Sequence, residues 1–259
     1  MELGLNQKVV VITGGATGIG KAAAWAFLRE GCRVAICSRR LEVLEAARQE
    51  FAVQGYDVLV GSVNVCDHGA LAAFAQQVTD KLGGIDIWLN NAGANKIKPL
   101  MEFTPEEFEE VVRVNLTSVF SGCQIAARHM SSRGGGVILN AASFAALAPN
   151  AGRAPYSAAK AGVLSLTRTF AAELAPSNIR VLSYVPGMIE TEIAAGSIDR
   201  YRETLLRDIP MQRFGRPEDL AQVLVFAASP AAGYMTGTHI EISGGKRCVQ
   251  NPWYAYENA

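Results

Sequence analysis

The sequence predicts an α/β fold: one doubly wound parallel sheet of about seven strands, with helices on both faces. Short apolar runs alternate with longer amphipathic segments along most of the chain, which is typical of parallel strands joined by helical crossovers. The chain has 259 residues, 49% of them apolar, enough to bury a large core. No Pro- or Ser-rich linker divides it, so we interpret residues 1–259 as a single domain.

The first half of the chain supplies four of the predicted strands. The run from Lys8 to Ile12 is continuously apolar and β-branched after its lysine, as expected of a strand buried on both faces. A helical pattern follows each of the first three strand-like runs. The predicted strands are 8–12, 33–37, 57–60 and 85–89, and the helices between them are 18–30, 41–53 and 69–81.

The second half continues the alternation. Thr104 is placed to cap a helix, and Pro105 suits its first position, where a missing N–H loses no hydrogen bond. That helix is predicted to run to about residue 131. The remaining strands are predicted at 136–140, 179–183 and 238–242, and the remaining helices at 158–174 and from Pro217 to about residue 228.

One long segment, residues 186–215, interrupts this rhythm. It contains Gly187, Gly196, Pro210 and Gly215 and shows only short helical patches. A connection of this length without a strand is typical of a lid or a binding loop. We therefore expect residues 186–215 to cover a substrate site.

Composition excludes several classes of protein. The 24 Lys+Arg and 24 Asp+Glu residues cancel, so we expect no nucleic-acid partner. The five cysteines are odd in number and form no Cys-x-x-Cys pair, so we expect reduced thiols in a cytoplasmic protein and no metal site. The sequence also lacks a long uncharged apolar stretch and a signal-peptide pattern, so no membrane association is expected.

A glycine-rich turn lies between the first predicted strand and the first predicted helix. It runs from Thr13 to Gly20 with the spacing Gly-x-x-x-Gly-x-Gly. Glycines in this place allow backbone N–H groups to approach a pyrophosphate and let the helix pack close to the strand. The position of the turn at the start of a parallel sheet predicts a Rossmann-type dinucleotide site.

The end of the second predicted strand favours NADP(H) over NAD(H). An NAD-selective site places a carboxylate there to bind the ribose hydroxyls. This chain has Ser38, Arg39 and Arg40 instead, and guanidinium groups suit a 2′-phosphate, which arginine binds in bidentate fashion. The alternative is that both arginines only decorate the start of a helix.

Tyr156 and Lys160 are spaced for acid–base chemistry. Four residues apart on a helix, they lie on one face about one turn apart. A free phenol is a poor proton donor at neutral pH, and a nearby ammonium favours the phenolate and should lower the pKa of Tyr156. The pair is therefore a candidate general acid and base.

These motifs occur in one order that resembles the classical short-chain dehydrogenase/reductase family, over about residues 6–245. The ordered set comprises the glycine spacing at 14–20, Asn90-Asn91-Ala92-Gly93, Asn115, Ser143, the Tyr156/Lys160 pair and Pro186-Gly187. The resemblance implies a Rossmann-type fold and an enzyme that interconverts a carbonyl and a secondary alcohol with a nicotinamide cofactor.

The resemblance also implies four catalytic roles. Tyr156 would exchange a proton with the substrate oxygen, and Lys160 would lower the pKa of Tyr156 and hold the nicotinamide ribose hydroxyls. Ser143 would hydrogen-bond the substrate oxygen. Asn115 would hold, through its backbone, a water linked to Lys160. Thr13 would brace the turn against the fourth strand.

Further residues would contact the cofactor by the same resemblance. After the third strand the family usually has Asp-Val, whereas this chain has Asn64-Val65; an Asn oxygen can still accept a hydrogen bond from adenine. The implied cofactor-binding residues are Gly14, Thr17, Gly18, Ile19, Gly20, Ser38, Arg39, Arg40, Asn64, Val65, Asn91, Ala92, Gly93, Tyr156, Lys160, Pro186, Gly187, Ile189 and Thr191.

The substrate is less constrained by the sequence. Lys96 and Arg153 could meet an anionic group, whereas the nearby apolar side chains suggest an apolar pocket. The candidate substrate residues are Asn95, Lys96, Phe144, Ala145, Arg153 and Met188. We favour a 3-oxoacyl thioester or similar ketone, with a sugar-acid or polyol dehydrogenase of the gluconate 5-dehydrogenase kind as the alternative. A non-catalytic nucleotide sensor on the same fold is the alternative from another class.

The C-terminal tail, residues 246–259, is aromatic. It contains Trp253, Tyr254 and Tyr256, side chains enriched at protein interfaces. Relatives of this kind are usually tetramers whose C-terminal ends lie near a two-fold axis. We therefore expect a homotetramer or a dimer, in which the tail crosses to a neighbouring subunit and helps to wall its active site. A frayed terminus is the alternative.

Overall fold

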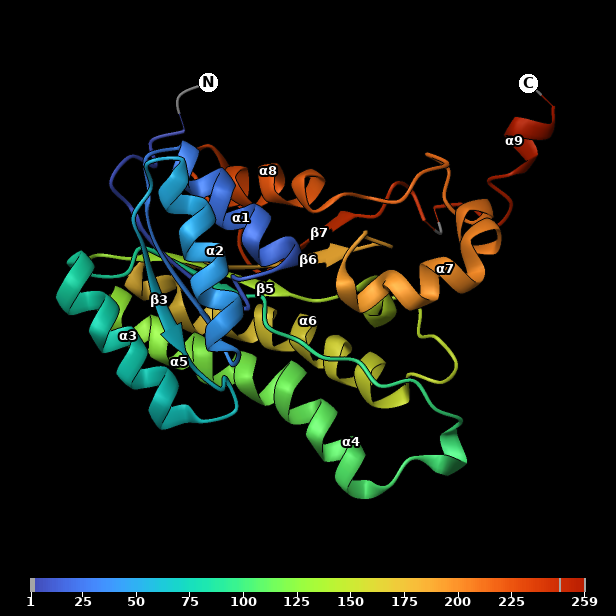
Figure 1. Ribbon diagram of the computed structural model, residues 1–259, viewed down its shortest axis with the longest axis horizontal. Helices are drawn as coiled ribbons and strands as arrows, with labels where there is room; N and C mark the ends of the chain where they lie inside the picture. The colour runs from blue at the N-terminus through green and yellow to red at the C-terminus, as the bar shows by residue number, and fades with distance from the viewer. Residues whose placement is uncertain (1–2, 247, 259) are drawn as a thin grey trace.

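The computed structural model describes residues 3–246 and 248–258, and its centre is one parallel sheet (Figure 1). Seven strands lie in the order β3-β2-β1-β4-β5-β6-β7, and every neighbouring pair is parallel. The strands are β1 (Val9–Thr13), β2 (Arg33–Ser38), β3 (Val58–Ser62), β4 (Ile87–Asn90), β5 (Gly136–Ala141), β6 (Ile179–Pro186) and β7 (His239–Ile242). The predicted fold class is confirmed.

Helices cover both faces of this sheet (Figure 1). One layer contains α1 (Gly18–Arg29), α2 (Leu41–Val53) and α8 (Pro217–Ala228), and the other contains α3 (His68–Leu82), α4 (Pro105–Val112), α5 (Ser118–Ser131) and α6 (Ala154–Leu174). Alternate residues of β1 enter opposite cores: Val10 and Ile12 pack in one hydrophobic cluster, and Val9 and Val11 in the other. Burial on both faces explains why the strand is apolar throughout.

The segment predicted to hold only short helical patches forms a long helix, so that expectation was wrong. α7 (Glu192–Arg207) has 16 residues, interrupted at Tyr201 by non-helical angles (φ −128°, ψ 27°). Ile198 is its one fully buried residue and packs with Met188, Ile209 and Phe214 in a small separate cluster. The helix is polar on average yet amphipathic, and Ala194, Leu205 and Leu206 pack partly buried against the same cluster; the sequence prediction missed this apolar face.

Two further boundaries differ from the sequence prediction. The predicted helix 104–131 is interrupted at Arg113–Thr117 by a π-helical turn, which separates α4 from α5. α6 begins at Ala154, four residues earlier than predicted, so Tyr156 lies in its first turn. Both differences involve candidate catalytic residues, since the π-helical turn contains Asn115 and the added first turn of α6 contains Tyr156; π-helical turns often occur at functional sites.

The tail after β7 ends in the short helix α9 (Tyr254–Glu257), next to the far end of α7 (Figure 1). The Tyr256 hydroxyl donates to the Pro210 carbonyl at 2.6 Å, and the Arg207 guanidinium lies 4.7 Å from the centre of the Trp253 ring. Within this chain, the tail therefore packs against the end of α7 and the residues that follow it. Arg247 and Ala259 lie outside the described residues.

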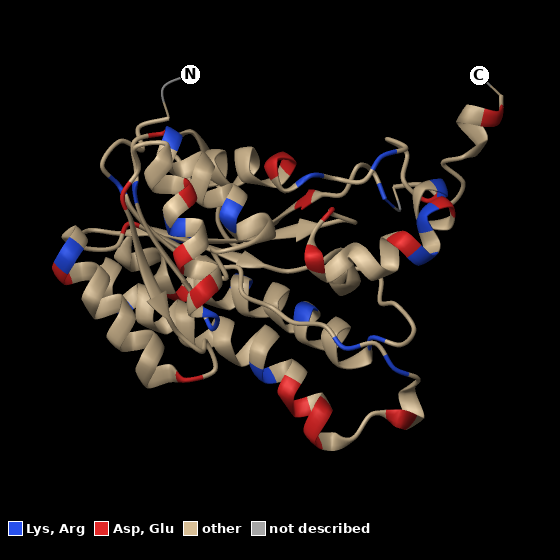
Figure 2. Ribbon diagram, in the orientation of Figure 1, with Lys and Arg blue, Asp and Glu red and all other residues tan. Residues whose placement is uncertain are grey.

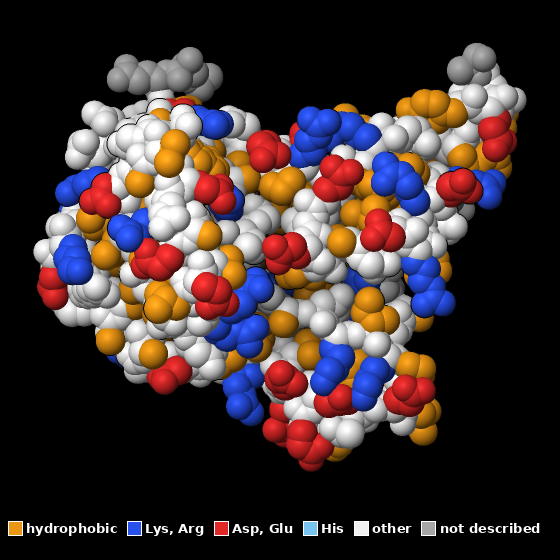
Figure 3. Space-filling view, viewed as in Figure 1, with side chains coloured by type: hydrophobic (Ala, Val, Ile, Leu, Met, Phe, Trp, Pro, Cys, Tyr) orange, Lys and Arg blue, Asp and Glu red, His pale blue; other side chains and the backbone are white. Residues whose placement is uncertain are grey.

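Charged side chains of both signs are mixed over the surface (Figures 2 and 3). The acidic side of α4 is partly neutralised by the preceding loop, because Lys96 and Lys98 each place Nζ 2.8 Å from Glu107 Oε1. Across the described residues, no helix is both long and apolar enough to span a membrane, and no three His, Cys, Asp or Glu side chains gather as a metal site would require.

Candidate active site

Two adjoining cavities lie at the carboxyl ends of the strands, where ligands bind in doubly wound sheets. The larger, of about 250 Å³, contains Ser143, Tyr156 and Lys160, and α7 forms one of its walls. The smaller, of about 140 Å³, contains Ser38, Arg39 and Arg40. Both are lined by Gly14, Thr17, Ala92 and Gly93, so together they form an elongated site.

The glycine-rich turn borders both cavities and is held firmly to β4. The Thr13 hydroxyl accepts hydrogen bonds from the backbone N–H groups of Asn91 (3.0 Å) and Ala92 (3.1 Å) and donates to the Leu89 carbonyl (3.2 Å). This is the bracing expected of Thr13. Gly20 allows α1 to approach, because a Cβ there would meet the Gly14 carbonyl oxygen. Gly20 itself lies outside both linings.

The side chain of Asn91 also supports the glycine-rich turn. Its Nδ2 donates to the carbonyls of Thr13 and Gly14, each at 3.1 Å, and its Oδ1 accepts from the Tyr184 hydroxyl at 2.9 Å. The side-chain amide is therefore committed to the protein, although Asn91 lines the larger cavity. Its contribution to a ligand site is to shape the backbone around it.

The smaller cavity is basic. Its described lining contains Arg39 and Arg40 and no acidic residue. Asn64 and Val65 also line it, and Asn64 Oδ1 accepts from the Cys66 N–H at 3.1 Å. Arg40 reaches toward the first residue of α7, with its Nη2 3.7 Å from Glu192 Oε2. The arginines predicted to recognise a phosphate therefore lie at the end of the elongated site.

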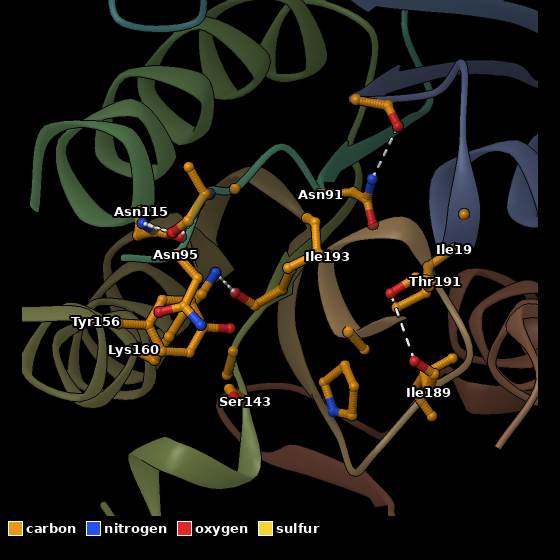
Figure 4. Close-up of a pocket in the computed structure, with 18 of the residues that line it drawn as sticks. Ile19, Asn91, Asn95, Asn115, Ser143, Tyr156, Lys160, Ile189, Thr191 and Ile193 are labelled. Atoms are coloured by element: carbon orange, nitrogen blue, oxygen red, sulfur yellow. Dashed lines mark hydrogen bonds between the residues drawn. The ribbon is translucent and has the colours of Figure 1, made fainter. Parts of the chain in front are cut away.

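Four predicted catalytic residues line the larger cavity together (Figure 4). Ser143 follows β5, and its Oγ accepts from the Ala145 N–H at 3.2 Å. On α6, Lys160 Nζ lies 5.7 Å from the centre of the Tyr156 ring and donates to the Ala141 carbonyl at 2.7 Å. In the close-up, Ser143, Tyr156 and Lys160 lie opposite Ile189, Thr191 and Ile193 of the lid region.

The π-helical turn positions Asn115. Its Nδ2 donates to the carbonyls of Ala94 (2.7 Å) and Val111 (2.9 Å), and the side chain is fully buried. These hydrogen bonds tie the loop after β4 to α4. The π turn displaces the backbone from regular i to i−4 pairing, and Asn115 within it lines the larger cavity.

Burial sets the pKa values of the catalytic pair. It raises the pKa of Tyr156, and the Ser143 hydroxyl and the Arg153 charge oppose it. Burial lowers the pKa of Lys160 to about 8. The sequence argument expected a lowered pKa for Tyr156; the structure gives the opposite net direction, because loss of solvent disfavours the phenolate more than the neighbouring groups favour it.

The candidate substrate residues divide into two groups. Asn95, Phe144, Arg153 and Met188 line the larger cavity. Ala145 is buried and Lys96 is paired with Glu107, and neither lines it.

Eight described lining residues of the larger cavity were not among the predicted site residues. They are Ala94, Ala141, Ala142, Tyr184, Glu192, Ile193, Ala194 and Ser197. Tyr184 precedes the recognised Pro186-Gly187 by two residues on the same strand, a period-2 signal that could have identified it. The last four lie on α7, which was not expected to be a regular helix.

Comparison with known proteins places these features in a family. The short chain dehydrogenase family matches residues 8–201. A 3-oxoacyl-(acyl-carrier-protein) reductase of Thermotoga maritima is 39% identical over 93% of this chain and 98% of its own. A 3alpha-hydroxysteroid dehydrogenase of Mediterraneibacter gnavus is 34% identical over 95% and 100%, respectively.

Solved structures agree with the sequence comparison. A short-chain type dehydrogenase/reductase from Mycobacterium marinum superimposes with a TM-score of 0.91 at 37% identity, over 95% of this chain and 97% of that one. A 7 alpha-hydroxysteroid dehydrogenase complexed with NADH and 7-oxo glycochenodeoxycholic acid gives 0.91 at 32% identity, over 95% and 96%. The chain belongs to the short-chain dehydrogenase/reductase family and is an NAD(P)-dependent oxidoreductase of CH–OH and C=O groups.

Proposed function

We propose that this protein is an NADP(H)-dependent enzyme that interconverts a ketone and a secondary alcohol. The observation that carries the proposal is the continuity of the two cavities. Tyr156, Lys160 and Ser143 line the larger one, Arg39 and Arg40 line the smaller one, and the glycine-rich turn borders both. The site thus combines a basic end with a proton-transfer end.

The residues present fit a dinucleotide phosphate. Arg39 and Arg40 would hold a 2′-phosphate, since guanidinium groups pair with phosphate oxygens in bidentate fashion. Gly14, Gly18 and the N-terminus of α1 would hold the pyrophosphate, with Thr17 and Ile19 beside it. When bound, the nicotinamide supplies hydride transfer; Pro186, Gly187, Ile189 and Thr191 would flank it.

The chain's own residues would move the proton. Because burial raises the pKa of Tyr156, its hydroxyl is protonated at neutral pH and can donate to the oxygen of a carbonyl undergoing reduction. Ser143 would hydrogen-bond the same oxygen and stabilise its developing charge. Lys160 would bind the ribose hydroxyls and favour the tyrosinate that remains, and Asn115 would connect this proton path to water.

A 3-oxoacyl thioester or similar ketone is the proposed substrate. The names of reductases that are 34–39% identical to this chain support it, and Phe144, Met188 and Ile189 give the cavity apolar walls. A sugar-acid or polyol dehydrogenase is the second candidate. Arg153 favours it, because that residue adds a positive charge to the cavity lining.

A kinetic screen tests the proposal. NADPH and NADH oxidation would be followed with 3-oxoacyl thioesters, sugar acids and cyclic ketones, and the cofactor Kd values measured separately. We expect turnover of at least one ketone, with tighter binding of NADPH. Failure to reduce any member of the panel with either cofactor would refute the proposed reaction, and tighter binding of NADH would refute the cofactor assignment.

We also propose that the enzyme works in the cytoplasm as a homotetramer or dimer. The five cysteines support the first point, since all are free thiols in the structure. The aromatic tail supports the second, with Tyr254 and Tyr256 exposed on this chain. Sedimentation analysis of the purified protein would measure its assembly directly.

A further inference from the structure

Arg153 is an uncommitted charge in the larger cavity. The two other charged side chains in its described lining have partners: Lys160 lies beside Tyr156, and Glu192 Oε2 lies 3.7 Å from Arg40 Nη2. Arg153 donates through Nη2 to the Ser197 hydroxyl at 3.1 Å, and within the described part of the chain it forms no ion pair with a carboxylate. A guanidinium group that is partly removed from water is stabilised by an anionic partner, which it can bind in bidentate fashion.

The backbone fixes Arg153 beside the reacting group. It caps the N-terminus of α6, where its carbonyl accepts from the Ser157 N–H at 2.9 Å, and Tyr156 follows three residues later. Its charge opposes the rise of the Tyr156 pKa. The guanidinium is thus held close enough to influence the hydroxyl that exchanges the proton.

Lys98, a neighbour of Arg153 in space, differs from it in two ways: its charge is neutralised, and its side chain lies outside the cavity. Lys98 lies next to it in space, since the Lys98 N–H donates to the Gly152 carbonyl at 3.1 Å. Lys98 Nζ is 2.8 Å from both carboxylate oxygens of Glu107, and the side chain does not line the cavity. The neutralised charge of Lys98 and the uncommitted charge of Arg153 are therefore close together in space, although the two residues are far apart in the chain.

The same cavity also contains an unsatisfied acceptor. Asn95 Oδ1 is buried and has no hydrogen-bond partner, and Asn95 lines the cavity beside the catalytic residues (Figure 4). Buried polar atoms are nearly always paired. A ligand that carries a hydrogen-bond donor for Asn95 Oδ1 and an acceptor for the Arg153 guanidinium would satisfy both side chains.

We infer that Arg153 binds a carboxylate of the substrate, so that the enzyme selects hydroxy and oxo acids over their neutral esters and amides. Ser197 orients the guanidinium through one N–H and leaves others free for the two oxygens of a carboxylate. This inference rests on the proposed interconversion of a ketone and an alcohol. It specifies the substrate class of the same site in favour of the second candidate, a free acid, because a 3-oxoacyl thioester has no carboxylate for Arg153 to bind.

The test compares an acid with its neutral counterparts. Butanoate and butanamide would be titrated by calorimetry into the NADP⁺-loaded enzyme, and 3-hydroxybutanoate and its ethyl ester would be assayed for oxidation. We expect the acid to be preferred. Arg153→Gln should reduce that preference by roughly 10- to 100-fold, the usual effect of losing a charge-assisted hydrogen bond, while Arg153→Lys retains part of it.

Lys98→Gln is the matched control, because it removes an equal charge nearby but outside the lining. It should leave the acid-to-amide ratio unchanged. If Arg153 acted only on the pKa of Tyr156, its replacement would change acid and ester turnover equally and leave butanoate binding unaltered, which would overturn the inference. Equal binding of butanoate and butanamide to the wild-type protein would also overturn it. Absence of turnover with every ketone and alcohol would instead refute the proposed function, and calorimetry would still decide the role of Arg153.

Discussion

The ammonium of Lys160 lies in surroundings that disfavour its charge. The side chain is 3% exposed, donates to the Ala141 carbonyl, and has its pKa lowered from 10.5 to about 8 by burial. Between these two pH values the folded protein binds fewer protons than the unfolded chain, so its free energy of unfolding rises with pH. The energetic cost of burying the ammonium is fully present below pH 8 and is relieved as pH rises toward 10.5.

Comparison with Lys160→Met isolates this effect. We expect the free energy of unfolding of the wild type, relative to the variant, to increase between pH 8 and 10.5 by up to about 3 kcal/mol. Urea denaturation of the cofactor-free proteins across this range would measure it. The buried thiols titrate alike in both proteins and cancel. A difference that is independent of pH would contradict the buried-ammonium interpretation.

Tyr156→Phe tests the proton donor. The substitution removes the hydroxyl and keeps the ring, so cofactor affinity should be retained while kcat for ketone reduction falls by roughly 10²- to 10⁴-fold. Steady-state kinetics and NADPH fluorescence titration provide the two measurements. Tyr234→Phe, at a fully exposed position, is the control. A non-catalytic sensor would show no turnover to lose.

Arg39→Ala tests the cofactor assignment. Removal of a guanidinium from the smaller cavity should raise the Kd for NADPH by roughly 10- to 100-fold, because a charge-assisted hydrogen bond to phosphate is lost. The Kd for NADH should change little. Equal weakening of both cofactors would show that Arg39 acts on the fold of the cavity rather than on the 2′-phosphate.

At this scale the sequence predicted what depends on local spacing. The four-residue spacing of Tyr156 and Lys160 and the order of the glycines, taken together with the family resemblance, predicted residues of which most line the two adjoining cavities. Ser197 and Glu192 were missed because their approach to the cavity depends on how α7 folds back. The direction of the Tyr156 pKa was also missed, since burial is a property of the assembled site.

Among the elements, α7 shows most clearly where sequence patterning fails. The bounds of α2 (Leu41–Val53) were predicted correctly from its sequence. α7 packs its apolar face on a small cluster that is separate from the two main cores: Ile198 is buried with Met188, Ile209 and Phe214, and Ala194, Leu205 and Leu206 pack partly buried against them. A helix held by so few apolar contacts opens more readily than the sheet beneath it.

This weak attachment can be tested with Ile198→Ala. Loss of the buried side chain should loosen the lid, increasing the rate of proteolytic cleavage within residues 192–207 severalfold and raising KM. The main unfolding transition should shift much less, because the two large cores are untouched. Ile193→Ala on the same helix, where the side chain is 67% exposed, should not accelerate cleavage. Equal protease resistance of Ile198→Ala and wild type would contradict the idea.

For the whole molecule, the sequence predicted a doubly wound parallel sheet but not the strand order β3-β2-β1-β4-β5-β6-β7. Regular alternation of strands and helices constrains a parallel sheet to few topologies, and the residues at the strand ends then converge on one edge. The tail could not be placed in this way. It contains no strand, and its contacts to Pro210 and Arg207 join segments about 45 residues apart.

Deletion of residues 249–259 tests the role of the tail. If it crosses to a neighbouring subunit, the deletion should weaken the assembly or raise KM, which sedimentation and kinetics would detect. Tyr256→Phe is the finer variant, because it removes only the hydrogen bond to Pro210 within the chain. Unchanged assembly together with unchanged kinetics in the truncated protein would eliminate the proposed intersubunit role.

The ion pair between Arg40 and Glu192 has a consequence for protein engineering. It joins the basic cavity to the first turn of the lid, although both side chains are largely exposed, at 61% and 73%. Such a pair contributes at most about 1 kcal/mol, which is a factor of about five in an equilibrium constant. A redesign that replaces Arg40 to accept NADH would also release Glu192. Cofactor preference and the attachment of α7 to the cavity would therefore change together, and the two traits are best optimised in the same library.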